Sequence, residues 1–103
     1  MSQKAHLLVV DDEAGIRESL SSILKDEGYH VEAVGSAEEA LERAAVGDLE
    51  VILLDVWLPG MDGLSALSRL QASARPPAVI MISGHGTIET AVRATKLGAF
   101  DFI

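Results

Sequence analysis

Short apolar runs alternate along the chain with longer segments in which apolar residues recur every three or four positions. A short apolar run bounded by polar or turn-forming residues is typical of a buried strand, and the wider spacing is typical of one face of a helix. Residues 29–33 differ because apolar and polar side chains alternate there, which places their strand nearer an edge of the sheet. Strands are therefore predicted at 6–10, 29–33, 51–54, 78–82 and 100–103.

Four helices are predicted between these strands, each bounded by start and stop signals. Ser36 followed by Glu39 matches a capping box, and glycine commonly ends a helix. The predicted helices run from Ala14 to Gly28, from Ser36 to Gly47, from Asp62 to the prolines at 76 and 77, and from Thr87 to Gly98. The stripes expected to face the core are Ile16, Leu20, Ile23 and Leu24 in the first helix and Ile88, Ala91, Val92 and Thr95 in the last.

The regular alternation of strand and helix makes each connection between strands a crossover. This order predicts an α/β fold with a doubly wound, predominantly parallel five-stranded sheet and helices on both faces. A chain of 103 residues has room for one domain, which is expected to cover residues 1–103. In open sheets of this kind, ligands bind at the carboxyl ends of the strands, near the point where the strand order reverses.

Composition and charge narrow the classes of partner. The chain has 16 acidic against 8 basic side chains and a formal net charge of -8, which disfavours direct binding to DNA or RNA and suits a metal cation or a basic partner surface. The absence of cysteine excludes disulfides and thiolate metal sites. The first apolar run is too short for a signal peptide or a membrane span, so we expect a cytoplasmic protein with no membrane partner.

Polar side chains follow three of the predicted strands at the point where each strand ends. Asp11 and Asp12 follow the first strand, Asp55 the third and Ser83 the fourth. Taken singly, each of them has a structural explanation as a helix cap, a turn residue or the start of a loop. Together, three carboxylates at one edge of a sheet repel one another, and they must take up protons or bind a cation. The sequence therefore predicts a site for Mg²⁺, or for Mn²⁺ in its place, because these ions prefer oxygen ligands.

A carboxylate in such a site can also act as a nucleophile and form an aspartyl phosphate. Asp55 is the best candidate for the phosphoryl acceptor because it ends the most central predicted strand. A bound cation would offset the incoming phosphoryl charge, and the Ser83 hydroxyl can donate a hydrogen bond to a phosphoryl oxygen.

The segments VVDDE, LLDVWLPGMDG, MISGHG and LGAFDFI resemble the receiver domain of response regulators in two-component signalling. The resemblance covers about residues 7–103, and the stretch SGHGTIETAVRATKLGAFDFI is most similar to receivers of the NtrC class, which precede sigma-54-dependent activators of transcription. It implies a flavodoxin-like strand order 2-1-3-4-5, a sensor histidine kinase as phosphoryl donor, and an output domain in a longer protein. It implies a conformational switch and not an enzyme, apart from catalysis of the domain's own phosphorylation and dephosphorylation.

The resemblance also implies roles for individual residues. Asp55 is the phosphoryl acceptor, and Ser83 is the hydroxyl residue that turns toward the phosphoryl group. Phe102 falls at the aromatic position whose side chain moves inward when that happens. The implied cation site consists of Asp12 and Asp55 as ligands, Asp11 holding the water shell, and the backbone carbonyl of Trp57.

The sequence departs from this family at its end. Receivers carry a Lys after the fifth strand, expected two residues past Ile103, and a last helix on the same sheet face as the first helix; this sequence contains neither. We therefore expect part of that face to be uncovered, and a homodimer or segment-exchanged dimer to form through it. The alternative to a phosphoacceptor is a truncated, phosphorylation-impaired receiver that acts as a dimerisation or assembly module.

Two other classes share parts of the pattern. A phosphohydrolase of the haloacid-dehalogenase type needs a second Asp two residues after its nucleophile, and this sequence has Trp57 there. A flavodoxin needs a glycine- and hydroxyl-rich phosphate loop after the first strand, where this sequence reads DDEAG. Both classes are therefore disfavoured.

Overall fold

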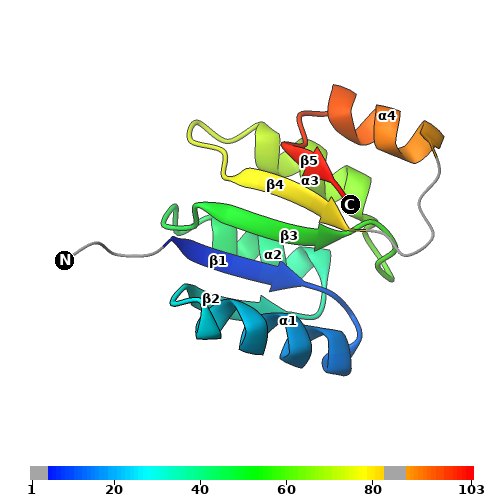
Figure 1. Cartoon of the computed structure of the whole chain (residues 1–103). Helices are drawn as coiled ribbons and strands as arrows, with labels where there is room; N and C mark the ends of the chain where they lie inside the picture. Colours follow the sequence, from blue (N-terminus) through cyan, green and yellow to red (C-terminus); the bar gives the residue numbers. More distant parts are fainter. Residues whose placement is uncertain (1–4, 83–87) are drawn as a thin grey trace.

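A computed structural model of the chain describes residues 5–82 and 88–103. Five parallel strands form one sheet in the order β2-β1-β3-β4-β5, and each is joined to the next by a helix (Figure 1). The elements are β1 (His6–Val10), α1 (Ala14–Asp26), β2 (His30–Val34), α2 (Ala37–Ala44), β3 (Val51–Asp55), α3 (Gly63–Gln71), β4 (Ala78–Ile82), α4 (Ile88–Lys96) and β5 (Asp101–Phe102). The predicted α/β class, the parallel sheet and the strand order are confirmed.

Several residues that the sequence predicts to begin or end a helix do so in the structure. The Ser36 side chain accepts a hydrogen bond from the Glu39 N–H at 3.1 Å, and the Asp62 side chain accepts one from the Ser65 N–H at 2.8 Å. Gly28, which follows α1, has a φ of 94°, a conformation that glycine adopts without strain. Thr87, the predicted cap of the last helix, lies outside the described residues.

β5 is shorter than predicted, with two residues in place of four. It pairs with β4 through Ile80 opposite Asp101 and Met81 opposite Phe102. The N–H groups of Phe100 and Ile103 also donate to carbonyls of β4, at 2.8 Å each. The end of the described chain therefore lies along the outer edge of β4.

The core lies on one face of the sheet, under α2, α3 and α4. The side chains that β1, β3 and β4 send to this face are fully buried, as are the helix residues that cover them. They include Leu8, Val10, Ile52, Leu54, Val79 and Met81 from the strands, and Ala40, Ala66, Leu67 and Ala94 from the helices. Burial of this many large apolar side chains is the main source of the fold's stability.

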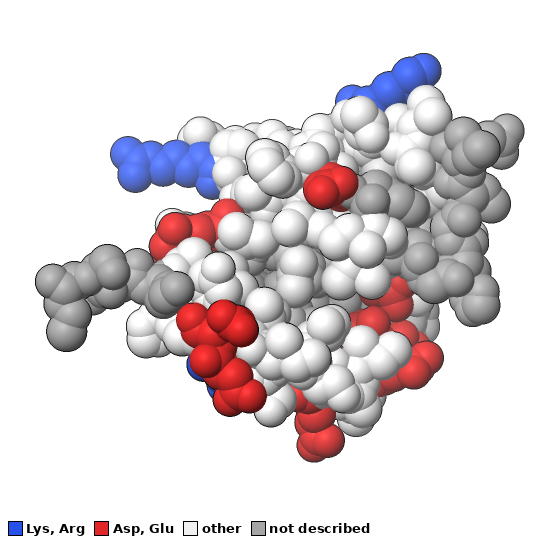
Figure 2. Space-filling model, in the orientation of Figure 1, with Lys and Arg blue, Asp and Glu red and all other residues white. Residues whose placement is uncertain are grey.

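The opposite face carries only α1 among the described residues (Figure 1). No residue of α1 is buried, and the strand residues Val51, Leu53 and Ile80 remain half-exposed. A groove of about 300 Å³ lies there, lined by Leu24, Tyr29, Leu53 and Ile80 among others. Figure 2 shows a largely uncharged surface over β3 and β4, with acidic side chains gathered around α1. The predicted uncovered part of this face is thus present in the described structure.

The predicted core stripes of the two flanking helices are partly wrong. In α1, Leu20 and Leu24 are half-buried, but Ile16 is 38% exposed and Ile23 is 60% exposed. Among the described side chains of α4, Ala94 is buried and Val92 is 47% exposed, while the side chain of Ile88 lies outside the described part of the structure. The periodicity of a helix indicates an apolar face, but only the neighbouring elements decide how much of it is covered.

Candidate metal centre

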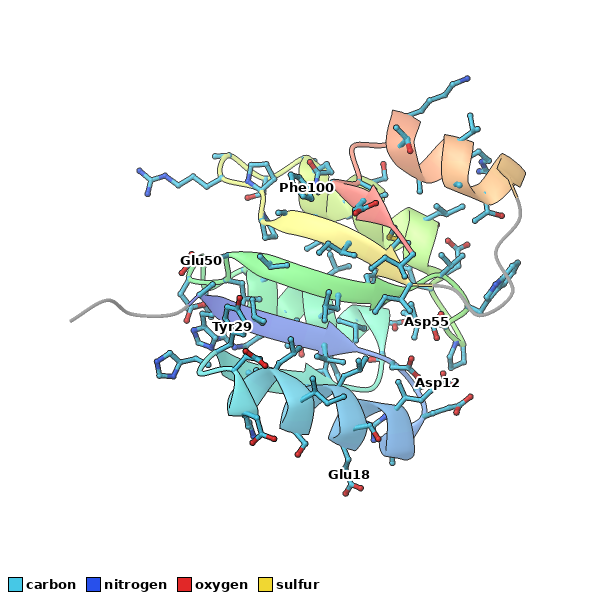
Figure 3. All side chains as sticks on the ribbon, in the orientation of Figure 1. Asp12, Glu18, Tyr29, Glu50, Asp55 and Phe100 are labelled. Carbon is cyan, nitrogen blue, oxygen red and sulfur yellow. The ribbon has the colours of Figure 1, made fainter. Side chains whose placement is uncertain are left out.

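Three carboxylates converge at the carboxyl ends of the central strands. Asp11 and Asp12 follow β1, and Asp55 is the last residue of β3, which pairs with β1. Each carboxylate contributes one oxygen to a group in which all three oxygens lie within 4.8 Å of one another. Asp11 is 5% exposed, Asp55 is half-buried and Asp12 is exposed. Figure 3 shows Asp12 and Asp55 at the same edge of the sheet, so the cluster opens toward solvent through Asp12.

Asp11 is fixed by the backbone around it. Its N–H donates to the Val34 carbonyl of β2 at 3.2 Å, and its Oδ1 accepts a hydrogen bond from the Glu13 N–H at 2.9 Å. Its own carbonyl accepts a hydrogen bond from Arg17 Nη1 at 2.8 Å. The buried carboxylate is therefore oriented by the start of α1, and its loss of hydration is partly offset by the Glu13 N–H.

Asp55 is held by the loop that follows β3. Its Oδ1 accepts a hydrogen bond from the Trp57 N–H at 3.0 Å. Further along, Gly63 begins α3 and packs so closely against the end of β3 that a Cβ there would lie 2.3 Å from the Asp55 carbonyl oxygen. The loop thus returns directly over the end of β3, which requires glycine at position 63. Sequence reasoning missed this residue, although its DG dipeptide is an ordinary turn signal.

The electrostatics of the cluster favour a cation. Burial raises the pKa of the Asp55 carboxyl above its usual value of 3.8, and the neighbouring charges of Asp11 and Asp12 raise that pKa further. The Trp57 N–H acts in the opposite direction because it stabilises the carboxylate. A divalent cation would remove the repulsion without protonating any of the three groups. An all-oxygen set of carboxylates open to water on one side suits Mg²⁺, which keeps several water ligands.

Three other residues were predicted to belong to the site, and the structure describes them only in part. Trp57 is the second residue after β3, and the residue is 55% exposed. Ser83 lies outside the described residues, directly after Ile82, which pairs with Asp55 in the register of β3 and β4. Phe102 belongs to β5, and its side chain lies outside the described part of the structure. The structure therefore brings together Asp11, Asp12 and Asp55 and does not test the other three roles.

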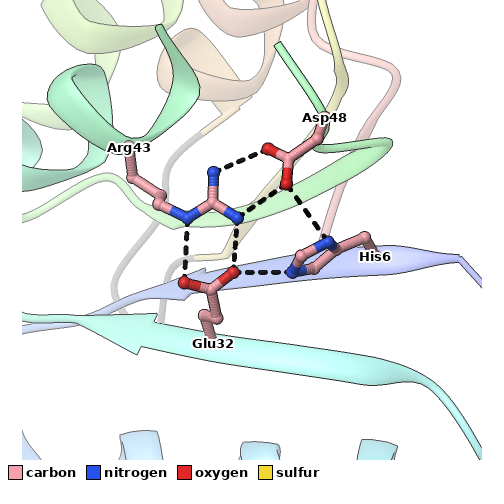
Figure 4. A network of polar contacts seen from close by, with 4 residues as sticks. All are labelled: His6, Glu32, Arg43 and Asp48. Atoms are coloured by element: carbon pink, nitrogen blue, oxygen red, sulfur yellow. Dashed lines mark hydrogen bonds and ion pairs between the residues drawn. The ribbon is translucent and has the colours of Figure 1, made fainter. Parts of the chain in front are cut away.

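A second polar cluster lies at the amino ends of β1 and β3 (Figure 4). Arg43 of α2 binds Glu32 and Asp48, each through two hydrogen bonds of 2.5–3.0 Å. His6 Nε2 lies 2.6 Å from Glu32 Oε2, and His6 Nδ1 lies 3.5 Å from Asp48 Oδ2. These four residues, which sequence reasoning assigned no function, tie β1, β2 and α2 to the loop before β3 at the end of the sheet away from the carboxylates. No sequence motif pointed to the cluster, because its members are far apart along the chain.

No helix among the described residues is long and apolar enough to cross a membrane.

The sequence is similar to a known family and to several known proteins. Residues 7–103 match the family model of the response regulator receiver domain. A putative NtrX-like response regulator of Rickettsia bellii is 46% identical over 99 residues, which make up 94% of this chain and 21% of that protein. The transcriptional regulatory protein FixJ of Bradyrhizobium diazoefficiens is 36% identical over 103 residues, or 100% of this chain and 50% of that protein. The chain thus spans about a fifth to a half of the length of these curated relatives.

Solved structures show the same similarity in three dimensions. The receiver domain of NtrX from Brucella abortus is 43% identical, with a TM-score of 0.86 over 94% of this chain and 82% of that one. A CheY-like receiver domain protein from Methanospirillum hungatei is 32% identical, with a TM-score of 0.92 over 99% of this chain and 81% of that one. Both comparisons agree with the fold described above. The chain therefore belongs to the response regulator receiver domain family, the signalling module of two-component systems.

Proposed function

We propose that this chain accepts a phosphoryl group on Asp55, in the presence of a divalent cation, from a sensor histidine kinase. The observation that carries this proposal is the group of three carboxylate oxygens within 4.8 Å of one another at the ends of β1 and β3. Membership of the receiver family supports the same chemistry. Asp55 is the acceptor because it ends the central strand, between the acidic pair after β1 and the end of β4.

The cation site is proposed to consist of Asp12 and Asp55 as direct ligands, the backbone carbonyl of Trp57, and Asp11 acting through bound water. The ion is Mg²⁺ or Mn²⁺, because the donor set consists of oxygens alone. When bound, such an ion would offset the negative charge that builds up on the phosphoryl oxygens. Asp11 suits the water-mediated role because it is buried and its Oδ1 is already engaged by the Glu13 N–H.

The transfer step needs one nucleophile and one leaving group. An Asp55 carboxylate oxygen attacks the phosphorus of a phosphohistidine, the new P–O bond forms, and the P–N bond breaks with its electron pair left on the imidazole nitrogen. The product is an acyl phosphate at Asp55. Attack of water on that phosphorus returns the carboxylate and releases inorganic phosphate, so the only reactions attributed to the chain are its own phosphorylation and dephosphorylation.

Switching is proposed to follow from the new charge at Asp55. The Ser83 hydroxyl turns toward the phosphoryl group and donates a hydrogen bond to one of its oxygens, and the Phe102 side chain moves inward when this happens. The relatives are named as regulatory proteins of transcription and of nitrogen assimilation, so we propose that the switch controls an output domain, in a longer protein, that acts on transcription. A cytoplasmic location fits this role, because the kinase draws on ATP.

The test is the intact mass of the protein after incubation with Mg²⁺ and acetyl phosphate. We expect a gain of one phosphoryl group that is lost on treatment with base, since acyl phosphates are base-labile. Asp55→Asn removes the gain, while Glu50→Gln, which neutralises an exposed carboxylate next to the opposite end of β3, retains it. A folded wild-type protein that gains no mass, or an Asp55→Asn variant that gains the same mass, contradicts the proposal.

A second role, as a dimerisation or assembly module, is favoured by one observation. The apolar groove beside α1, lined in part by Leu24, Leu53 and Ile80, has no element packed over it among the described residues. We propose that a second copy of the chain covers this face, by simple association or by exchange of segments. Light scattering at increasing concentration is expected to show a dimer, and Leu53→Glu is expected to reduce it to a monomer. A stable monomer at high micromolar concentration contradicts this second role.

A further inference from the structure

Arg17 connects α1 to the end of β1 that carries the acidic pair. It lies in the first turn of α1 and is half-buried. Its Nη1 donates a hydrogen bond of 2.8 Å to the carbonyl oxygen of Asp11. That carbonyl belongs to the peptide group between Asp11 and Asp12, so the guanidinium contacts the backbone that joins the two carboxylates.

The Arg17 guanidinium also lies close to Gly35, in the loop between β2 and α2. A Cβ at Gly35 would lie 3.3 Å from Arg17 Nη1, closer than most such contacts. The Gly35 N–H in turn donates to Glu39 Oε2 at 2.9 Å. Glycine at position 35 therefore leaves the space in which the Arg17 guanidinium reaches the end of β1.

The orientation of the Asp12 carboxylate depends on this peptide more than the orientation of the Asp11 carboxylate does. Asp11 is also held through its N–H, which donates to the Val34 carbonyl, and through its carboxylate, which accepts from the Glu13 N–H. Asp12 is exposed, so the orientation of the peptide before it sets the direction in which its carboxylate leaves the backbone. A hydrogen bond from a charged donor is stronger than one between neutral groups, so Arg17 holds that peptide more firmly than a neutral side chain would.

We propose that Arg17 is a positioning residue for the cation site: it orients the peptide between Asp11 and Asp12 and thereby sets the affinity of the site for Mg²⁺. The inference rests on the proposed function, because it concerns the same carboxylates. Groups that orient metal ligands typically affect metal affinity by about tenfold or more when they are removed. We expect a weakening of about this size for Arg17→Met.

The experiment is a Mg²⁺ titration of the whole chain, followed by the fluorescence of Trp57, the single tryptophan of the sequence. Arg17→Met is compared with Arg17→Lys, which keeps a charged donor, and with Lys25→Met, which removes a basic residue from the last turn of the same helix. Gly35→Ala forces the guanidinium to shift by a few tenths of an ångström while leaving its charge in place. Thermal unfolding in EDTA shows which variants are folded, and phosphorylation by acetyl phosphate at saturating Mg²⁺ provides a second readout.

If Arg17 is a positioning residue, its variants should change the affinity for Mg²⁺ but not the final extent of phosphorylation. Arg17→Met and Gly35→Ala raise the Mg²⁺ concentration needed for half-saturation, Arg17→Lys lies between them and the wild type, and Lys25→Met matches the wild type. At saturating Mg²⁺, the final extent of phosphorylation of folded variants is unchanged. If the wild type binds Mg²⁺ and folded Arg17→Met binds it equally well, the inference is overturned and the proposed function stands. If the wild type itself shows no Mg²⁺ binding, the proposed cation site fails, and the inference fails with it.

Discussion

The repulsion among the three carboxylates should be measurable as a cost to folding. Asp55→Asn removes one charge from the cluster and keeps the shape of the side chain, and the amide oxygen can still accept the Trp57 N–H at 3.0 Å. In EDTA at neutral pH, we therefore expect Asp55→Asn to be more stable than the wild type. The same substitution removes a proposed ligand, so it should abolish most of the stabilisation by Mg²⁺.

The size of the effect follows from the separation of the oxygens. The oxygens lie within 4.8 Å of one another, and two ionised carboxylates at that limit repel by roughly 3 kcal/mol at an effective dielectric constant of 20, and by about 1 kcal/mol in water. Asp12 is exposed and Asp55 is half-buried, so solvent screening brings the net gain toward the lower figure. A gain of about 1–2 kcal/mol corresponds to a rise in Tm of roughly 4–16 °C for a domain of this size.

The stability that Asp55→Asn gains over the wild type should depend on pH. The pKa of Asp55 is raised in the folded state, mainly by burial, so the folded protein binds a proton at this group more readily than the unfolded chain does. The stability that this group contributes is fully present below its unfolded pKa, close to 3.8, and is lost as the pH rises through the raised pKa. The difference between Asp55→Asn and the wild type should therefore shrink as the pH falls toward 4.

Thermal unfolding followed by circular dichroism, in EDTA and in Mg²⁺, provides the assay. At a Mg²⁺ concentration of ten times the dissociation constant, the free energy of unfolding of the wild type rises by about 1.4 kcal/mol. This rise narrows or reverses the stability difference between the wild type and Asp55→Asn. Glu50→Gln removes one charge next to the opposite end of β3 and should respond to Mg²⁺ as the wild type does. An Asp55→Asn variant that is no more stable than the wild type in EDTA at pH 7 would refute the reasoning.

Three further predictions concern the scaffold. Arg43→Met should lower the urea midpoint of unfolding. Because Arg43 holds the pKa of the Glu32 carboxyl below its usual value, the wild type loses stability as the pH falls through that lowered pKa, and the variant should lose less. Urea unfolding between pH 3 and 7 measures both effects. Leu67→Ala in α3 leaves a cavity in a fully buried site and should reduce the free energy of unfolding by about 2–5 kcal/mol with little change in Mg²⁺ affinity. Gly63→Ala places a Cβ against the Asp55 carbonyl and should cost about 1–3 kcal/mol while also slowing phosphorylation by acetyl phosphate, as followed by intact mass.

Much of the fold could be predicted because the signals are local. The apolar runs at 6–10, 51–54 and 78–82 are strands buried on a sheet, and Ser36 and Asp62 cap helices as their sequences indicate. The acidic residues after the first and third strands also converge as expected, because parallel strands present their carboxyl ends at one edge of the sheet. Sequence order and strand direction are sufficient for that conclusion.

Tertiary contacts decided the remaining features. Ile16 and Ile23 of α1 belong to an apolar stripe, yet they are exposed, because the burial of a side chain depends on what packs beside it. The cluster around Arg43 joins four residues from separate elements, and the close approach of Gly63 to Asp55 depends on the path of a loop. The amino-acid sequence alone is sufficient to predict which elements form and which carboxylates meet, since both depend on local pattern and chain direction. Only the folded structure decided how those carboxylates are held and which apolar side chains stay exposed, because both depend on distances between residues far apart in the chain.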